Sequence, residues 1–147
     1  MDGRVVVSST MGEPAPRASD ASYILLVEDD PALRAGLTSL LELAGYSVRA
    51  AEHGAEALAL IDGEHAVRPA LALVDLFMPV MDGWTFVAEV RARAHLADLP
   101  IVVMTASGPS ALARAPACNG YLAKPIDFSK LSKVLDAALP SRLCVGA

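Results

Sequence analysis

Four short apolar segments, each followed at once by a polar or charged residue, constrain the fold of this chain more than any other feature of its sequence. Unbroken apolar runs of this kind are typical of strands that are buried on both faces of a parallel sheet. A further short strand is predicted over residues 46–50. The four segments and the residues that follow them are 23–27 (Glu28 and Asp29), 70–74 (Asp75), 100–104 (Thr105) and 120–123 (Lys124).

Helical patterns separate these strands. Asp30 before Pro31 is a typical helix start, because the carboxylate caps free backbone N–H groups and proline suits the first helical position. Leucines then recur at helical spacing as far as Gly45, which ends that helix. Asp82 is interpreted as a turn or capping residue rather than a ligand. Further helices are predicted over residues 55–61, 83–93 and 127–139.

Five strands that alternate with helices predict an α/β fold, with a parallel sheet covered on both faces. Right-handed crossovers then favour a doubly wound sheet, most simply the flavodoxin-like strand order 2-1-3-4-5. In such sheets the ligand site lies beyond the carboxyl ends of the strands. We therefore expect Glu28, Asp29, Asp75, Thr105 and Lys124 to share one crevice.

These side chains predict a specific chemistry. Three carboxylates in one crevice repel one another unless a cation joins them, and Mg²⁺ prefers such hard oxygen ligands. The carboxylate of Asp75 can attack phosphorus to give an aspartyl phosphate. Lys124 then supplies positive charge and Thr105 a hydroxyl for the phosphoryl oxygens. Any one of these residues alone is more simply a solvated loop residue or a helix cap, so the prediction depends on their occurring together.

Several segments of the chain resemble the receiver domain of two-component response regulators. The resemblance covers about residues 22–140, and its most specific part is the Asp-x-x-Met-Pro-x-Met-Asp-Gly pattern that begins at Asp75. An independent part is the Lys-Pro pair at Lys124. The resembling segments are residues 24–30, 74–83, 105–106 and 121–125.

The resemblance implies a role for each acid of the site. Asp75 is the expected phosphoacceptor, and Asp29 the direct ligand of Mg²⁺. Glu28 is expected to bind Mg²⁺ through water, and the backbone carbonyl of Phe77 to complete the protein ligands. A histidine kinase or a histidine phosphotransfer protein is the expected phosphodonor.

The same resemblance implies how the signal leaves the site. Lys124 is expected to contact the phosphoryl group, and Thr105 to move toward it on activation. Tyr121 matches the aromatic switch position of the family, whose side chain turns inward as the threonine moves. An ordinary strand aromatic remains the alternative for Tyr121. The phosphoryl group adds a charge of about −1.5 to −2, which is the local event that such a switch reads.

Two features depart from the family pattern. Thr105 and Lys124 are 19 positions apart (124 − 105), a few fewer than is typical, and Pro116 disfavours helical geometry just before it. We therefore predict a shortened or irregular fourth helix within residues 106–119. Phe77 and Ser107 occupy positions that flank the path of an attacking water. Phe77 either slows loss of the phosphoryl group or serves only in packing.

Composition limits the remaining possibilities. The 147 residues fit one domain, and the formal charge of −5 comes without a Lys/Arg cluster, so nucleic-acid binding is not expected. No apolar run approaches the ~20 residues that cross a membrane, and no secretory signal is visible, so we expect a cytoplasmic protein. Residues 1–21 and 141–147 are predicted to be tails flanking a domain over 22–140.

The favoured interpretation is a stand-alone response regulator that acts through contacts with an unknown target protein, and not an enzyme beyond its own phosphorylation and dephosphorylation. A receiver-like interaction module that works without phosphorylation is the main alternative. A phosphatase or phosphotransferase is disfavoured because such enzymes usually carry a second acid where this chain has Phe77. A flavodoxin is disfavoured because Glu28 and Asp29 would repel the phosphate of its cofactor.

Overall fold

The computed structural model describes residues 22–63, 66–78, 80–106 and 118–139. Its parallel sheet has five strands in the order β2-β1-β3-β4-β5, which confirms the predicted flavodoxin-like topology. The strands are β1 (Ile24–Val27), β2 (Val48–Ala51), β3 (Leu71–Asp75), β4 (Ile101–Thr105) and β5 (Gly120–Ala123). The helices are α2 (Pro31–Leu43), α3 (Gly54–Asp62), α4 (Gly83–Ala92), the 3₁₀ helix η3 (Ala94–Leu96) and α5 (Phe128–Ala138).

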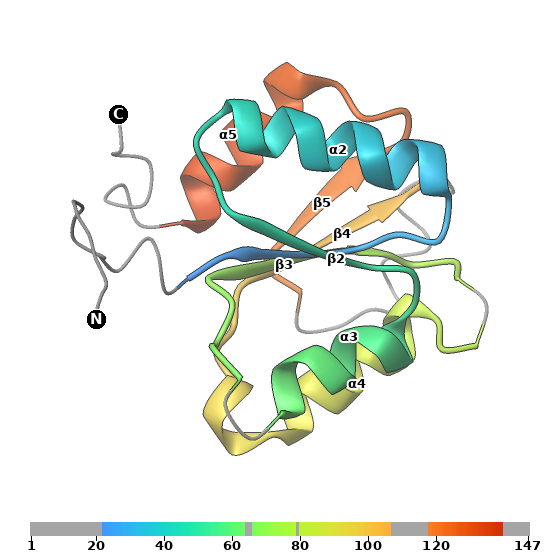
Figure 1. Cartoon of the computed structure of the whole chain (residues 1–147), viewed down its shortest axis with the longest axis vertical. Coiled ribbons are helices and arrows are strands. Elements are labelled where there is room, and N and C mark those ends of the chain that lie inside the picture. The colour runs from blue at the N-terminus through green and yellow to red at the C-terminus, as the bar shows by residue number, and fades with distance from the viewer. Residues whose placement is uncertain (1–21, 64–65, 79, 107–117, 140–147) are drawn as a thin grey trace, which may run out of the picture.

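Helices cover the sheet from both sides. Figure 1 shows α2 and α5 on one face and α3 and α4 on the other. Side chains of β1 alternate between the two layers: Leu25 and Val27 pack on the side of α3 and α4, and Ile24 and Leu26 on the side of α2 and α5. Because β1, β3 and β4 are buried on both faces, their continuous apolar runs are the expected consequence of this arrangement.

The predicted helix starts are confirmed where a carboxylate caps them. Asp30 accepts hydrogen bonds from the backbone N–H groups of Ala32 and Leu33, and Asp82 accepts one from Thr85. Gly83, which follows the second cap, lies so close to β3 that an added Cβ would sit 2.6 Å from the backbone oxygen of Asp75. Only glycine therefore allows α4 to begin beside the strand that carries the aspartate.

The second strand and one short helix differ most from the sequence prediction, and the other boundaries lie within one or two residues of it. The second strand is Val48–Ala51 rather than residues 46–50, because the register pairs Ile24 with Val48 on an edge of the sheet that is largely exposed. The helix η3 was not predicted, since its three residues are too few to show a helical period.

Other predictions concern residues that the structure does not describe. Residues 107–117, which carry most of the predicted irregular helix, lie outside the described residues, and so do the predicted tails at 1–21 and 141–147. Within the described ranges, none of the helices has both the length and the apolar character that crossing a bilayer requires.

Candidate functional site

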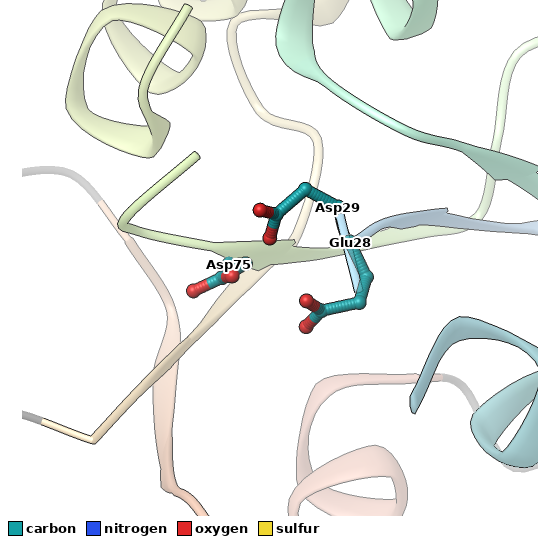
Figure 2. Close-up of side chains that lie close together, drawn as sticks. All are labelled: Glu28, Asp29 and Asp75. Carbon is teal, nitrogen blue, oxygen red and sulfur yellow. The ribbon is translucent and has the colours of Figure 1, made fainter. Parts of the chain in front are cut away.

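Strand register brings the predicted acids together. Val27 of β1 pairs with Val74 of β3, so Glu28 and Asp75 leave neighbouring strands at the same level of the sheet. The carboxylates of Glu28, Asp29 and Asp75 each offer an oxygen, and these oxygens all lie within 4.8 Å of one another. Figure 2 shows the three side chains converging on one space beyond the strand ends. We call this group, together with Lys124, the acidic site.

Lys124 joins two of these acids. Its Nζ atom donates a hydrogen bond to Oδ2 of Asp75 at 3.1 Å and lies 3.0 Å from Oε1 of Glu28. The lysine follows β5, and its amide donates to the backbone oxygen of Thr105, so the end of the β4–β5 ladder fixes its position. The structure therefore brings together four of the predicted residues, from β1, β3 and the end of β5.

Both acids paired with Lys124 are removed from solvent. Glu28 is 0 % and Asp75 3 % exposed. Burial raises the pKa of Glu28 and of Asp75 above their ordinary values, and the nearby positive charge of Lys124 only partly offsets this. Burial alone would lower the pKa of Lys124, but its two carboxylate partners outweigh burial and raise it. One lysine is thus shared by two buried acids that also repel each other.

The oxygen atoms of the site are unequally satisfied. Glu28 Oε2 accepts from the backbone N–H of Asp30 at 3.0 Å, and Asp75 Oδ1 from that of Phe77 at 3.2 Å. Glu28 Oε1 is buried, and no described residue donates a hydrogen bond to it, since its approach to Lys124 is an ion pair without hydrogen-bond alignment. A buried carboxylate oxygen without a donor is costly, so this atom fits a bound water or ion.

Thr105 and Tyr121 are the two residues of the predicted switch. Thr105 ends β4 and is fully buried. Tyr121 pairs in register with Val103 of β4, and it packs, partly buried, against the apolar layer on the side of α3 and α4. These are starting positions only, and the movement of either side chain stays a prediction.

Comparison with known proteins identifies the family of this site. Residues 24–136 match the family model for the response regulator receiver domain. The chain belongs to the response regulator receiver family. Receiver domains act in two-component signalling and bind Mg²⁺ at an acidic pocket, and the acidic site of this chain lies where such a pocket is expected.

Solved receiver structures share the fold. The chemotaxis protein CheY4 of Vibrio cholerae is 31% identical, with a TM-score of 0.72 over 80% of this chain and 98% of CheY4. The receiver domain of the sensor histidine kinase PA1611 of Pseudomonas aeruginosa PAO1 is 28% identical, with a TM-score of 0.71 over 80% of this chain and 97% of that one. The PA1611 receiver structure has a magnesium ion coordinated in its active site cleft.

Curated relatives include longer proteins. The DNA-binding dual master transcriptional regulator RpaA of Synechocystis sp. (strain PCC 6803) is 32% identical over 111 residues, which are 74% of this chain and 45% of RpaA. The chain spans from about a quarter to about half of the length of the first curated relatives that it matches. The resemblance to these proteins therefore concerns the receiver domain.

The donor set of this receiver fits Mg²⁺. Three carboxylates whose oxygens lie within 4.8 Å of one another offer hard oxygen ligands, and Glu28 Oε1 is a buried acceptor that a metal-bound water can satisfy. Asp29 and Asp75 can ligate directly, and Glu28, held by Lys124 and the N–H of Asp30, can orient such a water. The donor set thus fits the cation that the resemblance implies.

Two residues, Lys124 and Arg34, make contacts in the receiver site that were not predicted from the sequence. The ion pair of Lys124 with Glu28 follows from topology, because both residues leave the same end of the sheet. The hydrogen bonds from Arg34 to the backbone of Glu28 and Asp29 have no sequence signal, since an arginine inside a helix is an ordinary solvated residue.

Proposed function

We propose that this receiver domain accepts a phosphoryl group on Asp75 from a histidine kinase or a histidine phosphotransfer protein, and passes the signal on by contacts with another protein. The observation that carries the proposal is the pairing of one lysine with two buried acids, Asp75 and Glu28, beside a third at Asp29. Such a site is unfavourable for stability alone, and it suits a dianionic phosphoryl group and a cation.

Each residue of the acidic site has its own proposed role in the phosphoryl-transfer step. A carboxylate oxygen of Asp75 forms a bond to phosphorus while the bond from phosphorus to the donor imidazole nitrogen breaks, and the electron pair stays with the imidazole. Bound Mg²⁺ supplies positive charge to the phosphoryl oxygens. Lys124 is proposed to pair with a phosphoryl oxygen, which its distance of 3.1 Å from Asp75 Oδ2 supports. Glu28 holds Lys124 from its other side.

The output of this step follows from residues next to Asp75. Thr105 is proposed to turn its hydroxyl toward the phosphoryl group, and Tyr121 to turn further into the space that this movement opens. Burial of Thr105 and the half-buried position of Tyr121 support a switch that repacks one side of β4 and β5. The changed surface beside these strands is then read by a partner protein, and no nucleic acid is assigned to the domain itself. Cytoplasmic location is part of the same proposal.

Phe77 is proposed to contribute its backbone carbonyl to Mg²⁺ and its ring to the lifetime of the phosphoryl group. Phe77 is 48% exposed, and its ring packs edge-on against Trp84, with ring centroids 5.0 Å apart. It is therefore not held by the core, which favours a role at the mouth of the site. Phe77→Asn is expected to shorten the lifetime of the phosphorylated protein several-fold, measured by loss of the adduct in intact mass. An unchanged lifetime would leave packing against Trp84 as its role.

Intact mass after incubation with Mg²⁺ and acetyl phosphate tests the proposal. Wild type is expected to gain one phosphoryl group, and Asp75→Asn none. Asp62→Asn, a carboxylate at the opposite end of the strands, serves as the control and is expected to react like wild type. Absence of an adduct on wild type that binds Mg²⁺ would favour the alternative, a receiver-like interaction module that works without phosphorylation.

A further inference from the structure

The guanidinium of Arg34 turns back from α2 toward the segment that carries two acids of the site. Arg34 is half-buried near the start of the helix. Its Nη1 atom donates to the backbone oxygen of Glu28 at 2.9 Å and to that of Asp29 at 3.4 Å. One side chain therefore binds the main chain of both residues and makes no hydrogen bond or ion pair with either carboxylate.

This segment needs such a contact because it has left the sheet. The amide of Glu28 still donates to the backbone oxygen of Ala51, but β1 ends one residue earlier, at Val27. Beyond this point Asp30 fixes the far end of the segment by capping α2, and its backbone oxygen accepts the first helical hydrogen bond from the amide of Arg34. Arg34 thus fixes the main chain of Glu28 and Asp29 between the end of β1 and the start of α2.

We infer that Arg34 is a positioning residue for the Mg²⁺ site, which sets the direction of the Glu28 and Asp29 side chains by fixing their main chain. The inference rests on the proposed function, since it concerns the same site. Residues that orient ligands without touching the metal commonly change metal affinity 10- to 100-fold when they are replaced. Nη1 carries two N–H groups in the rigid plane of the guanidinium fork, so this one nitrogen can donate to both backbone oxygens.

An effect of the Arg34 charge and an effect of its hydrogen bonds would change Mg²⁺ affinity in opposite directions. A positive charge beside a cation site weakens Mg²⁺ binding, so loss of the charge alone would tighten it. Loss of the two backbone hydrogen bonds loosens the segment and weakens Mg²⁺ binding. The direction of the change therefore separates a positioning residue from a nearby charge.

Arg91 offers a matched control at the other end of the sheet. Its Nη1 atom likewise donates to two backbone oxygens, those of Leu99 at 2.7 Å and Leu96 at 3.5 Å. These residues precede β4, whereas the acidic site follows the strands. Replacing Arg91 thus removes the same kind of backbone contact, together with its hydrogen bond to Oδ1 of Asn119, at the end of the strands away from the acidic site.

The test compares Arg34→Met with Arg91→Met by calorimetric titration with MgCl₂, and by urea unfolding in metal-free buffer. We expect Arg34→Met to weaken Mg²⁺ binding about 10-fold. Arg91→Met is expected to leave Mg²⁺ binding unchanged while lowering stability. Arg34→Lys, which keeps the charge and the aliphatic stem but not the fork, should bind Mg²⁺ with an intermediate affinity.

Each other outcome overturns the inference. Unchanged or tighter Mg²⁺ binding by Arg34→Met shows that the arginine serves stability or charge alone. If Arg34→Met does not fold, Arg34→Lys is compared with Arg91→Lys, and equal Mg²⁺ affinities of these two variants overturn the inference in the same way. If the wild type does not bind Mg²⁺, the proposed metal site is overturned, and the role of Arg34 with it. If the wild type binds Mg²⁺ and Arg34→Met binds it equally well, only the role of Arg34 is overturned.

Discussion

The charged side chains at the two ends of the parallel strands differ in their burial and in how they are paired. At the carboxyl ends, burial raises the pKa of Glu28 and of Asp75, and one lysine serves both. At the amino ends, Arg93 donates to both carboxylate oxygens of Asp62, at 2.6 and 2.8 Å, and its hydrogen bonds lower the pKa of that aspartate. The amino ends pair their charges at the surface, whereas the carboxyl ends keep a buried excess of negative charge that a cation would relieve.

This contrast distinguishes the acidic site from the charged groups at the other end of the strands. The charged groups of the amino ends lie in ion pairs at the surface, which cost little and contribute little. Those of the acidic site are buried, where an unmatched charge has a large effect on both stability and binding. A group of side chains that destabilises the folded protein when no cation is bound is a candidate functional site. The predictions below test the contrast, from the largest expected effect to the smallest.

Removal of Lys124 is expected to have the largest effect. Lys124→Met leaves Glu28 and Asp75 buried without a positive partner, and loss of one member of a buried ion pair costs about 3 kcal/mol. Urea unfolding in metal-free buffer at pH 7 measures this loss. Lys130→Met, which changes an exposed lysine of α5, is the control and should leave the free energy of unfolding within about 0.5 kcal/mol. Equal effects of the two variants would contradict the contrast.

Removal of the negative charge of Asp75 is expected to stabilise the metal-free protein. Asp75→Asn relieves repulsion with Glu28 and Asp29, which is worth about 1 kcal/mol at pH 7 after the lost pairing with Lys124. Because the folded pKa of Asp75 is raised, the wild type loses stability as the pH rises through that pKa. The advantage of the variant should therefore shrink as the pH falls from 7 toward 4. A variant less stable than wild type at pH 7 would show that the site is not under electrostatic stress.

At the amino ends the same kind of substitution should have the opposite sign and a smaller size. Asp62→Asn removes an exposed ion pair with Arg93 and is expected to cost about 0.5 kcal/mol at pH 7. The folded pKa of Asp62 is lowered, so its contribution is present above the unfolded pKa of about 4 and is lost as the pH falls through the folded pKa. Unfolding curves from pH 6 to 3 measure this. A cost that grows on acidification would reverse the assigned sign.

Structural features that depend on a short segment of the chain could be predicted from the sequence. The strand order follows from the alternation of apolar runs and helices, and the caps at Asp30 and Asp82 follow from one residue and its neighbours. Placement of Glu28 beside Asp75 needs only the rule that parallel strands end on one side. These are local signals, or consequences of topology.

The contacts made by two arginines could not be predicted. Arg34 reaches back five and six residues to two carbonyls, and Arg91 reaches Asn119 across 28 positions. Both have the sequence environment of an ordinary surface arginine, so no periodicity or cap distinguishes them. The same limit applies to the start of β2 at Val48, because a half-exposed edge strand carries a weak apolar pattern.

The dependence of thermal stability on Mg²⁺ tests the central claim most directly. A cation that binds only the folded acidic site raises the unfolding temperature with the logarithm of its concentration. We predict this rise for wild type and for Asp62→Asn, and its loss in Asp29→Asn, which changes the most exposed acid of the site and so disturbs the fold least. An equal rise in wild type and Asp29→Asn, or no rise in wild type, would contradict the assignment of the carboxyl ends as the cation and phosphoryl site.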